Sequence, residues 1–420
     1  MNPVRIFKFG GASVKDAEAV RNVSSILDLF PDDALIVVVS AMGKTTNALE
    51  ELHRARYSGS PVEEILEHIH TFHLNICRDL LGSREAAAEL MQPLMATLRA
   101  AVAAPCSDRF DREYDQVVSL GEWISTSIIH GYLESTGASS QLADARRVVR
   151  TDDRFRDARV DWTASALSIT PLREALTPGS RIIIQGFIGA APDGATTTLG
   201  REGSDFTAAI MAYLLDAGDV TIWKDVPGML NADPKRFPDS VKLDCISFRE
   251  AIELAYYGAS VIHPKTIKPL QNKGIPLYIK SFIDPAAAGT VIQESTERDH
   301  LVPSFIIKDN QVLISLSTRD FSFVVEDNLR DIFDTLVQLG VRIHLMENSA
   351  ISFSMVVDHD PYKQEQLLQA FAGRYAIRYN EGVTLATIRH YHDSTIRRLT
   401  EGREILLEQR SRQTVRMVMR

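Results

Sequence analysis

Lys8 and two glycines form the first group of residues that could bind a ligand, in the segment Lys8-Phe9-Gly10-Gly11. Glycines after a strand let a ligand approach the backbone closely, and the helix that follows offers unpaired N–H groups to an anion. Lys8 would add a mobile ammonium group, so the segment suits a phosphate. A tight strand-to-helix turn explains the same residues, and for this motif alone it is the better interpretation.

The segment from Gly186 to Asp205 is denser in functional groups. It contains several glycines, three consecutive threonines and Arg201, whose guanidinium group can hold a carboxylate through two hydrogen bonds. Ser204 and Asp205 stand where a helix should begin, at the end that favours negative charge. Ser204 as a helix N-cap and the threonines as a polar hairpin would explain part of the pattern. They do not explain Arg201 or the glycines, so we favour a functional site.

A third group begins at Trp223-Lys224-Asp225-Val226-Pro227-Gly228 and continues in Ala232-Asp233-Pro234-Lys235. A strand that ends at Asp225 would place a carboxylate at the carboxyl edge of a sheet, where open α/β folds bind ligands. Pro-Gly is also a good type II turn without any function. The two interpretations have equal weight for this group alone.

Four common catalytic patterns are missing from these segments. The lysine-glycine segment is neither a Walker A loop nor the Gly-x-Gly-x-x-Gly dinucleotide fingerprint. The chain also lacks the His-Glu-x-x-His zinc motif and the Gly-x-Ser-x-Gly nucleophile elbow. Nicotinamide chemistry, zinc proteolysis and serine hydrolysis therefore have no support.

The composition is that of an ordinary globular protein with more than one domain. The chain has 420 residues, 45% hydrophobic and 24% charged, with a formal net charge of -9. The length suits two or three domains, and the negative charge argues against a nucleic-acid binder. Apolar runs are strand-sized, so no membrane helix is expected, and the N-terminus resembles no secretion signal. Three well-separated cysteines, Cys77, Cys106 and Cys245, are expected to be buried thiols in a cytoplasmic protein.

Apolar periodicity predicts an α/β fold over the first 290 residues or so. Residues 45–137 are almost wholly helical in pattern and should form a helical lobe. The unbroken apolar run at 35–39 indicates a sheet covered on both faces, as in parallel α/β architectures. Strands are predicted at 4–9, 35–40, 141–143, 181–185, 220–223 and 277–279, and helices at 14–29, 162–176, 204–215 and 248–257.

The pattern changes after a polar linker at 293–300. A strand, a helix, two strands and a helix are predicted at 311–316, 329–339, 342–346, 352–357 and 362–371. A second and shorter unit should follow, with a strand at 383–390, a helix at 394–399 and strands at 405–409 and 414–419. The chain therefore ends in α+β units.

In chain order, these motifs resemble those of the aspartate kinases, members of the amino acid kinase family with C-terminal ACT domains. The resemblance spans about 290 residues and includes Lys8-Phe9-Gly10-Gly11-Ala12-Ser13-Val14, Ser40-Ala41-Met42-Gly43, Thr46-Asn47, Gly121-Glu122, the threonine-rich block to Asp205, Asp225-Val226-Pro227-Gly228, Asp233-Pro234, and Gly258-Ala259 through His263-Pro264. It implies a three-layer αβα sandwich with a mostly parallel sheet at 1–292, an ACT-like domain at 301–380 and a shortened ACT-like unit at 381–420.

The family resemblance implies transfer of the γ-phosphoryl group of MgATP to the β-carboxylate of L-aspartate, the first step of lysine, threonine and methionine biosynthesis. A β-carboxylate has a pKa of about 3.9, so it is already an ionised nucleophile and needs no general base. What the reaction needs is positioning and cancellation of negative charge.

The resemblance also assigns roles to single residues. Lys8 and Asp205 would be catalytic, with Asp205 holding the cations in place although no side chain ligates Mg²⁺ directly. The residues expected to bind ATP are Lys8, Gly10, Gly11, Ser13, Lys224, Asp225, Gly228, Lys235 and Ser260. The residues expected to bind aspartate are Ser40, Thr46, Glu122, Arg201 and Ser204.

Two positions depart from the family pattern. Many relatives carry a lysine where this chain has Ser260, and our hypothesis is that Lys224 supplies the missing charge. Glu202 stands where a glycine is common and adds a negative charge beside Arg201. His263 precedes a proline and is expected to be a hydrogen-bonded structural residue rather than an acid-base catalyst.

The C-terminal units are expected to bind an amino-acid effector, lysine or threonine, and to mediate a homodimer. The expected effector residues are Met346, Glu347, Asn348 and Ser349, although an ordinary polar turn explains them too. No homoserine dehydrogenase segment is expected. Two alternatives stay open: a kinase of the same fold that acts on glutamate, acetylglutamate or a nucleotide, and a non-catalytic amino-acid sensor.

Overall fold

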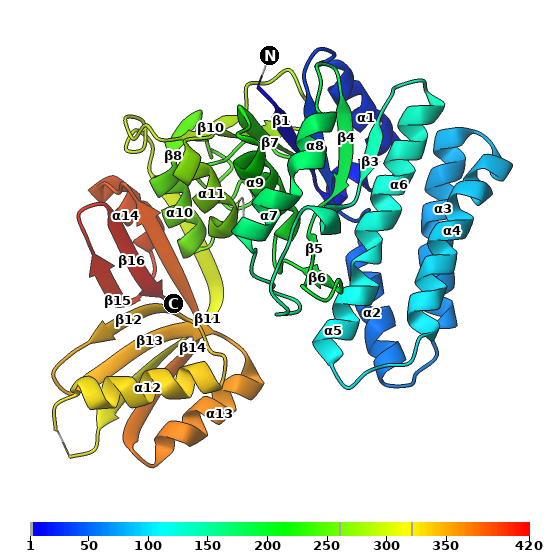
Figure 1. Ribbon diagram of the computed structural model, residues 1–420. Helices are drawn as coiled ribbons and strands as arrows, with labels where there is room; N and C mark the ends of the chain where they lie inside the picture. The colour runs from blue at the N-terminus through cyan, green and yellow to red at the C-terminus, as the bar shows by residue number, and fades with distance from the viewer. Residues whose placement is uncertain (1–2, 260–261, 321) are drawn as a thin grey trace. The chain divides into compact units, whose positions relative to one another are not determined.

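The computed structural model describes the chain except for residues 1–2, 260–261 and 321 (Figure 1). The chain divides into two compact units. The N-terminal unit lies within Met1–Met229, Lys242–Ile252 and Val261–Arg298. The C-terminal unit lies within Leu230–Val241, Glu253–Ser260 and Asp299–Arg420. Two short segments of the expected catalytic region therefore group with the C-terminal unit.

An eight-stranded sheet forms the centre of the N-terminal unit, in the order β3-β4-β2-β1-β7-β9-β10-β8. Every neighbouring pair is parallel except β9 with β10, which confirms the predicted mostly parallel sheet. The strands are β1 (Arg5–Phe9), β2 (Leu35–Val39), β3 (Gln141–Ala143), β4 (Arg181–Gln185), β7 (Asp219–Lys224), β8 (Cys245–Ser247), β9 (Leu277–Ser281) and β10 (Thr290–Gln293).

Helices cover both faces of this sheet. Side chains alternate between the two faces along each strand, so neighbouring residues of one strand contact different helices. Phe7 and Phe9 of β1 join an apolar core with α1 (Ala17–Asp28) and the helical lobe. Lys8 lies between them and points to the opposite face. There β1 packs against α9 (Gly203–Leu215), which in turn packs against α11 (Pro264–Lys273). The alternation therefore places Lys8 on the face that carries α9.

The predicted helical lobe consists of five helices, drawn in blue to cyan in Figure 1. They are α2 (Thr45–Tyr57), α3 (Glu63–Leu81), α4 (Arg84–Ala103), α5 (Phe110–Val118) and α6 (Leu120–Ser135). Ser83 caps α4 by accepting the N–H of Ala86, and Gly82 ends α3 with a positive φ of 64°. These local signals agree with a lobe over residues 45–137.

Several short elements complete the N-terminal unit. They are η1 (Gly11–Val14), η2 (Ala145–Arg147), α7 (Trp162–Ser168), α8 (Thr170–Ala175), α10 (Phe248–Tyr257), which continues into the C-terminal unit, and the hairpin of β5 (Ile188–Ala190) and β6 (Thr196–Thr198). The single helix predicted at 162–176 is in fact two helices. Pro171 has no N–H for an intrahelical bond, so it interrupts the first helix and is tolerated in the first turn of a second helix, which begins at Thr170.

The C-terminal unit is built on an antiparallel six-stranded sheet, in the order β12-β13-β11-β14-β16-β15. Helices α12 and α13 cover one face of this sheet, through a core that includes Ile332, Leu336, Leu367 and Phe371 (Figure 1). The elements are β11 (Ser304–Thr318), α12 (Glu326–Gln338), β12 (Ile343–Asn348), β13 (Ser352–Asp358), α13 (Pro361–Ala372), β14 (Tyr375–Arg389), α14 (Asp393–Thr400), β15 (Ile405–Arg410) and β16 (Thr414–Met419).

The expected boundary between two ACT-like units, at 380–381, lies inside the long strand β14. The pairing of β14 with β11 shifts register between Lys308 and Gln311, and Asn310 and Gly382 both have positive φ there. Before this irregularity the elements follow the order βαββαβ. After it only one helix, α14, accompanies the strands. The two units thus share one continuous sheet.

The structure tests the expected burial of the cysteines and the expected absence of membrane helices. Cys77 is buried and Cys245 is half-buried, but Cys106 is exposed. The expectation of a buried thiol is wrong for Cys106 because it lies in the loop between α4 and α5. None of the described helices is long and apolar enough to cross a bilayer.

Candidate active site

A cavity of about 490 Å³ opens in the N-terminal unit. Lys8, Ser40, Phe187 and Lys224 reach it from the carboxyl ends of β1, β2, β4 and β7, which are adjacent in the sheet. Open α/β sheets bind ligands at this edge. The lining residues are Lys8, Ser40, Thr46, Glu50, Tyr114, Glu122, Arg156, Phe187, Gly200, Arg201, Glu202, Gly203, Ser204, Asp205 and Lys224. Eight of them are residues that the sequence predicts for catalysis or binding.

Two lysines meet one carboxylate on the sheet side of the cavity. Lys8 Nζ lies 2.6 Å from Asp205 Oδ1, and Lys224 Nζ lies 3.8 Å from Asp205 Oδ2. Lys8 is 8% exposed and Asp205 is 3% exposed. A buried charge without a partner is strongly destabilising, so each group of the Lys8 and Asp205 pair requires the other in the absence of a ligand.

The start of α9 brings Asp205 into the cavity. The N-cap of α9 is Glu202 and the helix starts at Gly203, so the suggestion that Ser204 is the N-cap is wrong. A Cβ atom on Gly186 would lie 2.5 Å from the Cβ of Ser204. Gly186 is therefore needed because the loop after β4 approaches the first turn of α9 too closely for a side chain. Asp205 in that turn also benefits from the positive end of the helix dipole.

Glu122 of α6 is a buried carboxyl group on another wall of the cavity. Its Oε1 accepts the backbone N–H of Ala41 at 3.2 Å, while its Oε2 is buried and has no hydrogen-bond partner in the described part of the chain. Burial raises the pKa of Glu122 to about 8, and the hydrogen bond from Ala41 offsets only part of this shift. A cationic ligand group would stabilise the ionised form.

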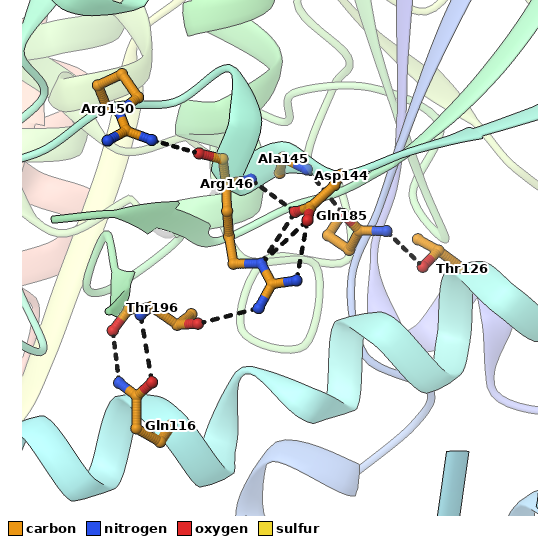
Figure 2. A network of polar contacts seen from close by, with 8 residues as sticks. All are labelled: Gln116, Thr126, Asp144, Ala145, Arg146, Arg150, Gln185 and Thr196. Carbon is orange, nitrogen blue, oxygen red and sulfur yellow. Dashed lines mark hydrogen bonds and ion pairs between the residues drawn. The ribbon is translucent and has the colours of Figure 1, made fainter. Parts of the chain in front are cut away.

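A hydrogen-bond network connects α6 with β4 and with the β5–β6 hairpin (Figure 2). Thr126, one turn after Glu122, accepts a hydrogen bond from Gln185 Nε2 at 3.0 Å. Gln185 Oε1 accepts the N–H of Ala145 at 2.9 Å. Arg146 pairs with Asp144 at 2.9 Å and reaches Thr196 Oγ1 at 3.4 Å. Gln185 of β4 therefore connects the helix that carries Glu122 to the segment that begins at Asp144.

The three consecutive threonines are structural in this arrangement. Thr198 donates to the buried Asp115 through its backbone N–H at 2.8 Å and its hydroxyl at 2.7 Å. The hydroxyls of Thr197 and Thr151 lie 2.7 Å apart. Burial raises the pKa of Asp115 to about 6 although it accepts these hydrogen bonds. The polar hairpin therefore explains the threonines, and the ligand-facing part of this segment begins at Gly200.

Arg201 follows the hairpin on an exposed turn that lines the cavity. In the described chain its guanidinium group has neither a hydrogen bond nor an ion pair with the protein. An arginine without a protein partner in a polar cavity can bind an anionic ligand, and its planar fork favours a carboxylate. The amino-acid contact that the sequence predicts for Arg201 is thus geometrically open.

Seven lining residues are not among those predicted for catalysis or binding, and three of them, Glu50, Tyr114 and Arg156, lie outside every motif. Tyr114 donates to Glu50 Oε1 at 2.5 Å, and the guanidinium group of Arg156 lies 4.4 Å from the centre of the Tyr114 ring. Phe187 contacts the helix start, since a Cβ atom on Gly203 would lie 2.6 Å from its Cδ2. Glu50 and Tyr114 come from the helical lobe and Arg156 from a loop, where no motif marked them.

Backbone strain gathers in the cavity wall. Six described residues other than glycine have positive φ, and three of them, Arg156, Phe187 and Glu202, line the cavity. A residue with a Cβ pays about 1–2 kcal/mol for left-handed geometry. Such strain often marks functional sites.

The remaining residues predicted to bind ATP lie outside this cavity. A Cβ on Gly11 would lie 2.9 Å from Ala41 O, and Ser13 donates to Trp223 O at 3.3 Å, so both join loops of the sheet edge. Gly10 leaves room for Lys8, whose Nζ would lie 3.2 Å from a Cβ there.

Four other positions complete that set. Asp225 lines a separate cavity of about 610 Å³ beside α1. Gly228 has a φ of 148°, and a Cβ there would lie 2.5 Å from Thr290 Oγ1. Lys235 is an exposed residue of the C-terminal unit, and Ser260 lies outside the described residues. His263 caps α11 by accepting the N–H of Lys265, as expected of a structural histidine.

The expected effector residues lie at an edge of the C-terminal sheet. Met346, Glu347 and Asn348 are exposed on β12, and Ser349 lies in the turn that follows. The hydroxyls of Ser349 and Ser352 are 2.7 Å apart. These residues are accessible to a ligand or to a second chain.

Comparison with known proteins places the chain in a family. Residues 3–281 match the model of the amino acid kinase family. Lysine-sensitive aspartokinase 3 of Escherichia coli K12 is 32% identical over 398 residues, which cover 92% of this chain and 87% of the relative. Aspartokinase 2 of Arabidopsis thaliana, a chloroplastic protein, is 31% identical, with 87% of this chain and 68% of the relative covered.

Solved structures agree with these sequence relatives. Escherichia coli aspartokinase III in complex with lysine and aspartate is 29% identical and has a TM-score of 0.79, with 99% of this chain and 95% of that chain covered. The same enzyme with aspartate and ADP gives 28% identity, a TM-score of 0.79 and coverage of 99% and 96%. The sequence-based family prediction is confirmed: the chain belongs to the amino acid kinase family and, within it, to the aspartokinases.

Proposed function

We propose that this protein transfers the γ-phosphoryl group of ATP to the β-carboxylate of L-aspartate, giving 4-phospho-L-aspartate and ADP. The observation that supports this function best is a single cavity in which a lysine-rich end and an amino-acid-binding end face the same space. The phosphate end consists of Lys8, Lys224 and Asp205. The amino-acid end consists of Arg201, Glu122, Ser40, Thr46 and Ser204.

At the amino-acid end, the chemistry requires opposite charges for the two groups on the α-carbon. Arg201 binds the α-carboxylate through its planar fork, and Glu122 Oε2 accepts from the α-ammonium group. The hydroxyls of Ser40, Thr46 and Ser204 supply further polar contacts. Held in this way, the substrate directs its β-carboxylate toward Lys8. No general base is needed, because this carboxylate is ionised at neutral pH.

At the phosphate end, an oxygen of the β-carboxylate attacks the γ-phosphorus, and the bond from phosphorus to the oxygen bridging to the β-phosphate breaks. Lys8 and Lys224 stabilise the charge on the transferring group and on the departing ADP. Lys224 thereby replaces the lysine that many relatives carry at the position of Ser260.

A magnesium ion fits this end of the cavity. Asp205 is a buried carboxylate in the cavity, and Mg²⁺ is usually held by one or two carboxylates together with phosphates and water. The described residues include no cluster of three or more histidine, cysteine or acidic side chains that could bind a metal without a nucleotide. Asp205 would therefore orient a magnesium ion that enters with ATP and neutralises its phosphates.

The C-terminal unit is proposed to regulate this activity. An amino acid, lysine or threonine, would bind at Met346 to Ser349, and two chains would associate through their C-terminal units. The exposed end of β12 at Met346–Asn348 supports both ideas because these side chains are accessible, whereas the carbonyls of His344 and Met346 already accept hydrogen bonds from Arg416 and Gln409. Light scattering of the purified chain, with and without each amino acid, measures the association directly.

Trapping of the acyl phosphate tests the main proposal. Hydroxylamine converts an acyl phosphate to a hydroxamate and phosphate, and the hydroxamate forms a coloured complex with ferric iron. The protein is therefore incubated with MgATP, hydroxylamine and aspartate, glutamate or acetylglutamate in turn. Hydroxamate formed only with aspartate is the expected result. Hydroxamate formed only with another acid would assign a different kinase activity, and none with all three would favour a non-catalytic sensor.

A further inference from the structure

Glu202 has a carboxylate in the cavity wall, and its backbone conformation and partial burial both destabilise the folded protein. Its backbone is left-handed, with a φ of 54° and a ψ of 29°, although it has a Cβ atom. Its Oε2 is buried and has no hydrogen-bond partner among the described residues. It stands between Arg201 and α9, in a backbone geometry that glycine adopts most easily.

The fold itself does not explain this carboxylate. Glu202 is the N-cap of α9, but its side chain makes no capping hydrogen bond and has no ion pair in the described chain. Asp216 at the other end of the same helix is a useful contrast. It is also left-handed, with a φ of 52°, but it is exposed and pairs with Lys273. Asp216 thus has a structural partner, whereas a partner for Glu202 has to come from a ligand.

The charged groups around Glu202 indicate which group of a ligand could be its partner. Arg201 is the adjacent residue and offers a cation to a carboxylate. Glu122 presents a second buried carboxylate oxygen without a partner. In an α-amino acid the carboxylate and the ammonium group are attached to the same carbon, and the ammonium group has three N–H donors. One carboxylate cannot satisfy them all.

We infer that Glu202 is a specificity-determining residue, a second anionic acceptor for the α-ammonium group of the substrate beside Glu122. This inference rests on the proposed function and refines it. Two acidic side chains in the wall favour a free α-amino acid and disfavour dicarboxylic acids that lack the ammonium group, because these bring a dianion and offer no cation to Glu202 or to the ionised form of Glu122. The strain at Glu202 is then retained for substrate selection.

Calorimetric binding of L-aspartate and of succinate, which lacks only the ammonium group, tests the inference without requiring turnover. The variant E202Q keeps the size of the side chain and removes its charge. It should weaken aspartate binding about tenfold, as expected for one charge-assisted hydrogen bond, and leave succinate binding unchanged or tighter. Equal weakening of both ligands, or no change for aspartate, would overturn the inference.

E202G separates the substrate role from a structural one. Glycine relieves the left-handed strain, so this variant should melt about 1–2 °C higher while it binds aspartate as weakly as E202Q does. A lower melting temperature would show that Glu202 stabilises the fold and would contradict the inference. D216G is the matched control at the other end of α9, and its aspartate affinity should be that of the unmodified protein.

Failure of this inference can be told from failure of the proposed function. If the unmodified protein forms aspartyl hydroxamate but E202Q binds aspartate normally, only the role of Glu202 is wrong. If the unmodified protein forms no hydroxamate with any acid, the kinase proposal fails, and the comparison of aspartate with succinate still decides whether Glu202 recognises an ammonium group.

Discussion

At the phosphate end of the cavity the charges are paired within the protein, whereas at the amino-acid end they have no protein partners. Lys8 and Lys224 both approach Asp205, so the single carboxylate there lies beside two ammonium groups. Arg201 has no ion pair in the described chain, and the buried oxygens Glu122 Oε2 and Glu202 Oε2 accept no hydrogen bond.

This difference suggests how each end works. Phosphates that enter the first end bring negative charge to lysines already held in place by Asp205, so binding costs little rearrangement and the lysines act mainly in the transition state. An amino acid that enters the second end supplies the missing partners, and two of the atoms it would contact, Glu122 Oε2 and Glu202 Oε2, are already buried. Substitutions at the phosphate end should therefore lower kcat, and those at the amino-acid end should raise KM.

The largest effect is expected for Lys8→Ala. This change removes the ammonium group at the end of β1 and should lower kcat on the order of 10³-fold, as for loss of a principal electrostatic group. Hydroxamate formation measures the rate, and calorimetry with aspartate is the control, because the amino-acid end should stay intact. A normal kcat, or a loss of aspartate affinity as large as the loss of rate, would show that the two ends are not separate.

Substitution of Arg201 should give the next largest effect, on the other kinetic parameter. Arg201→Ala should raise the KM for aspartate about 100-fold, because a two-point contact with the α-carboxylate is lost, and should leave the KM for ATP unchanged. Arg201→Lys keeps the charge but loses the planar fork, so it should recover only part of the affinity. Full recovery with lysine would contradict a fork-shaped contact.

Lys224→Ala tests the hypothesis that this residue replaces the lysine missing at position 260. Its Nζ lies 3.8 Å from Asp205, farther than that of Lys8, so a smaller loss is expected, about tenfold in kcat. The double substitution Lys224→Ala with Ser260→Lys should restore most of the rate. Full turnover of the single variant would show that the hypothesis is wrong.

The strands and helices of the N-terminal unit could be predicted because their periodicity and glycine positions are local signals. β3, β4 and α10 have the predicted bounds, and Lys8, Arg201 and Asp205 were found through their motifs. The role of the threonines was decided by Asp115, which is 83 residues away from Thr198 in the chain. Tyr114 and Arg156 reach the cavity only through the packing of the helical lobe and a strained loop, which no local pattern encodes.

The same limit applies to the titration of Glu122. Its motif marked it as a substrate contact, but its pKa of about 8 results from burial, which depends on how α6 packs against the loop after β2. Because an ammonium group binds the ionised form, Glu122 should release close to one proton when aspartate binds at pH 7. Below pH 8, the affinity for aspartate should increase by up to about tenfold for each unit by which the pH is raised. Calorimetry in buffers of different ionisation enthalpy measures this proton release.

Glu122→Gln is the control for the proton release, and it also tests how the melting temperature of the protein depends on pH. The pKa of Glu122 in the folded protein, about 8, lies above its ordinary value of 4.5. The protonated side chain therefore contributes its full stabilisation of the fold below pH 4.5, and this contribution is lost as the pH rises through about 8. The unmodified protein should therefore lose melting temperature between pH 5 and pH 9 relative to Glu122→Gln, which cannot ionise. If both proteins show the same pH dependence and the same proton release, Glu122 is ionised in the free protein, and the amino-acid end then holds a carboxylate before the substrate arrives.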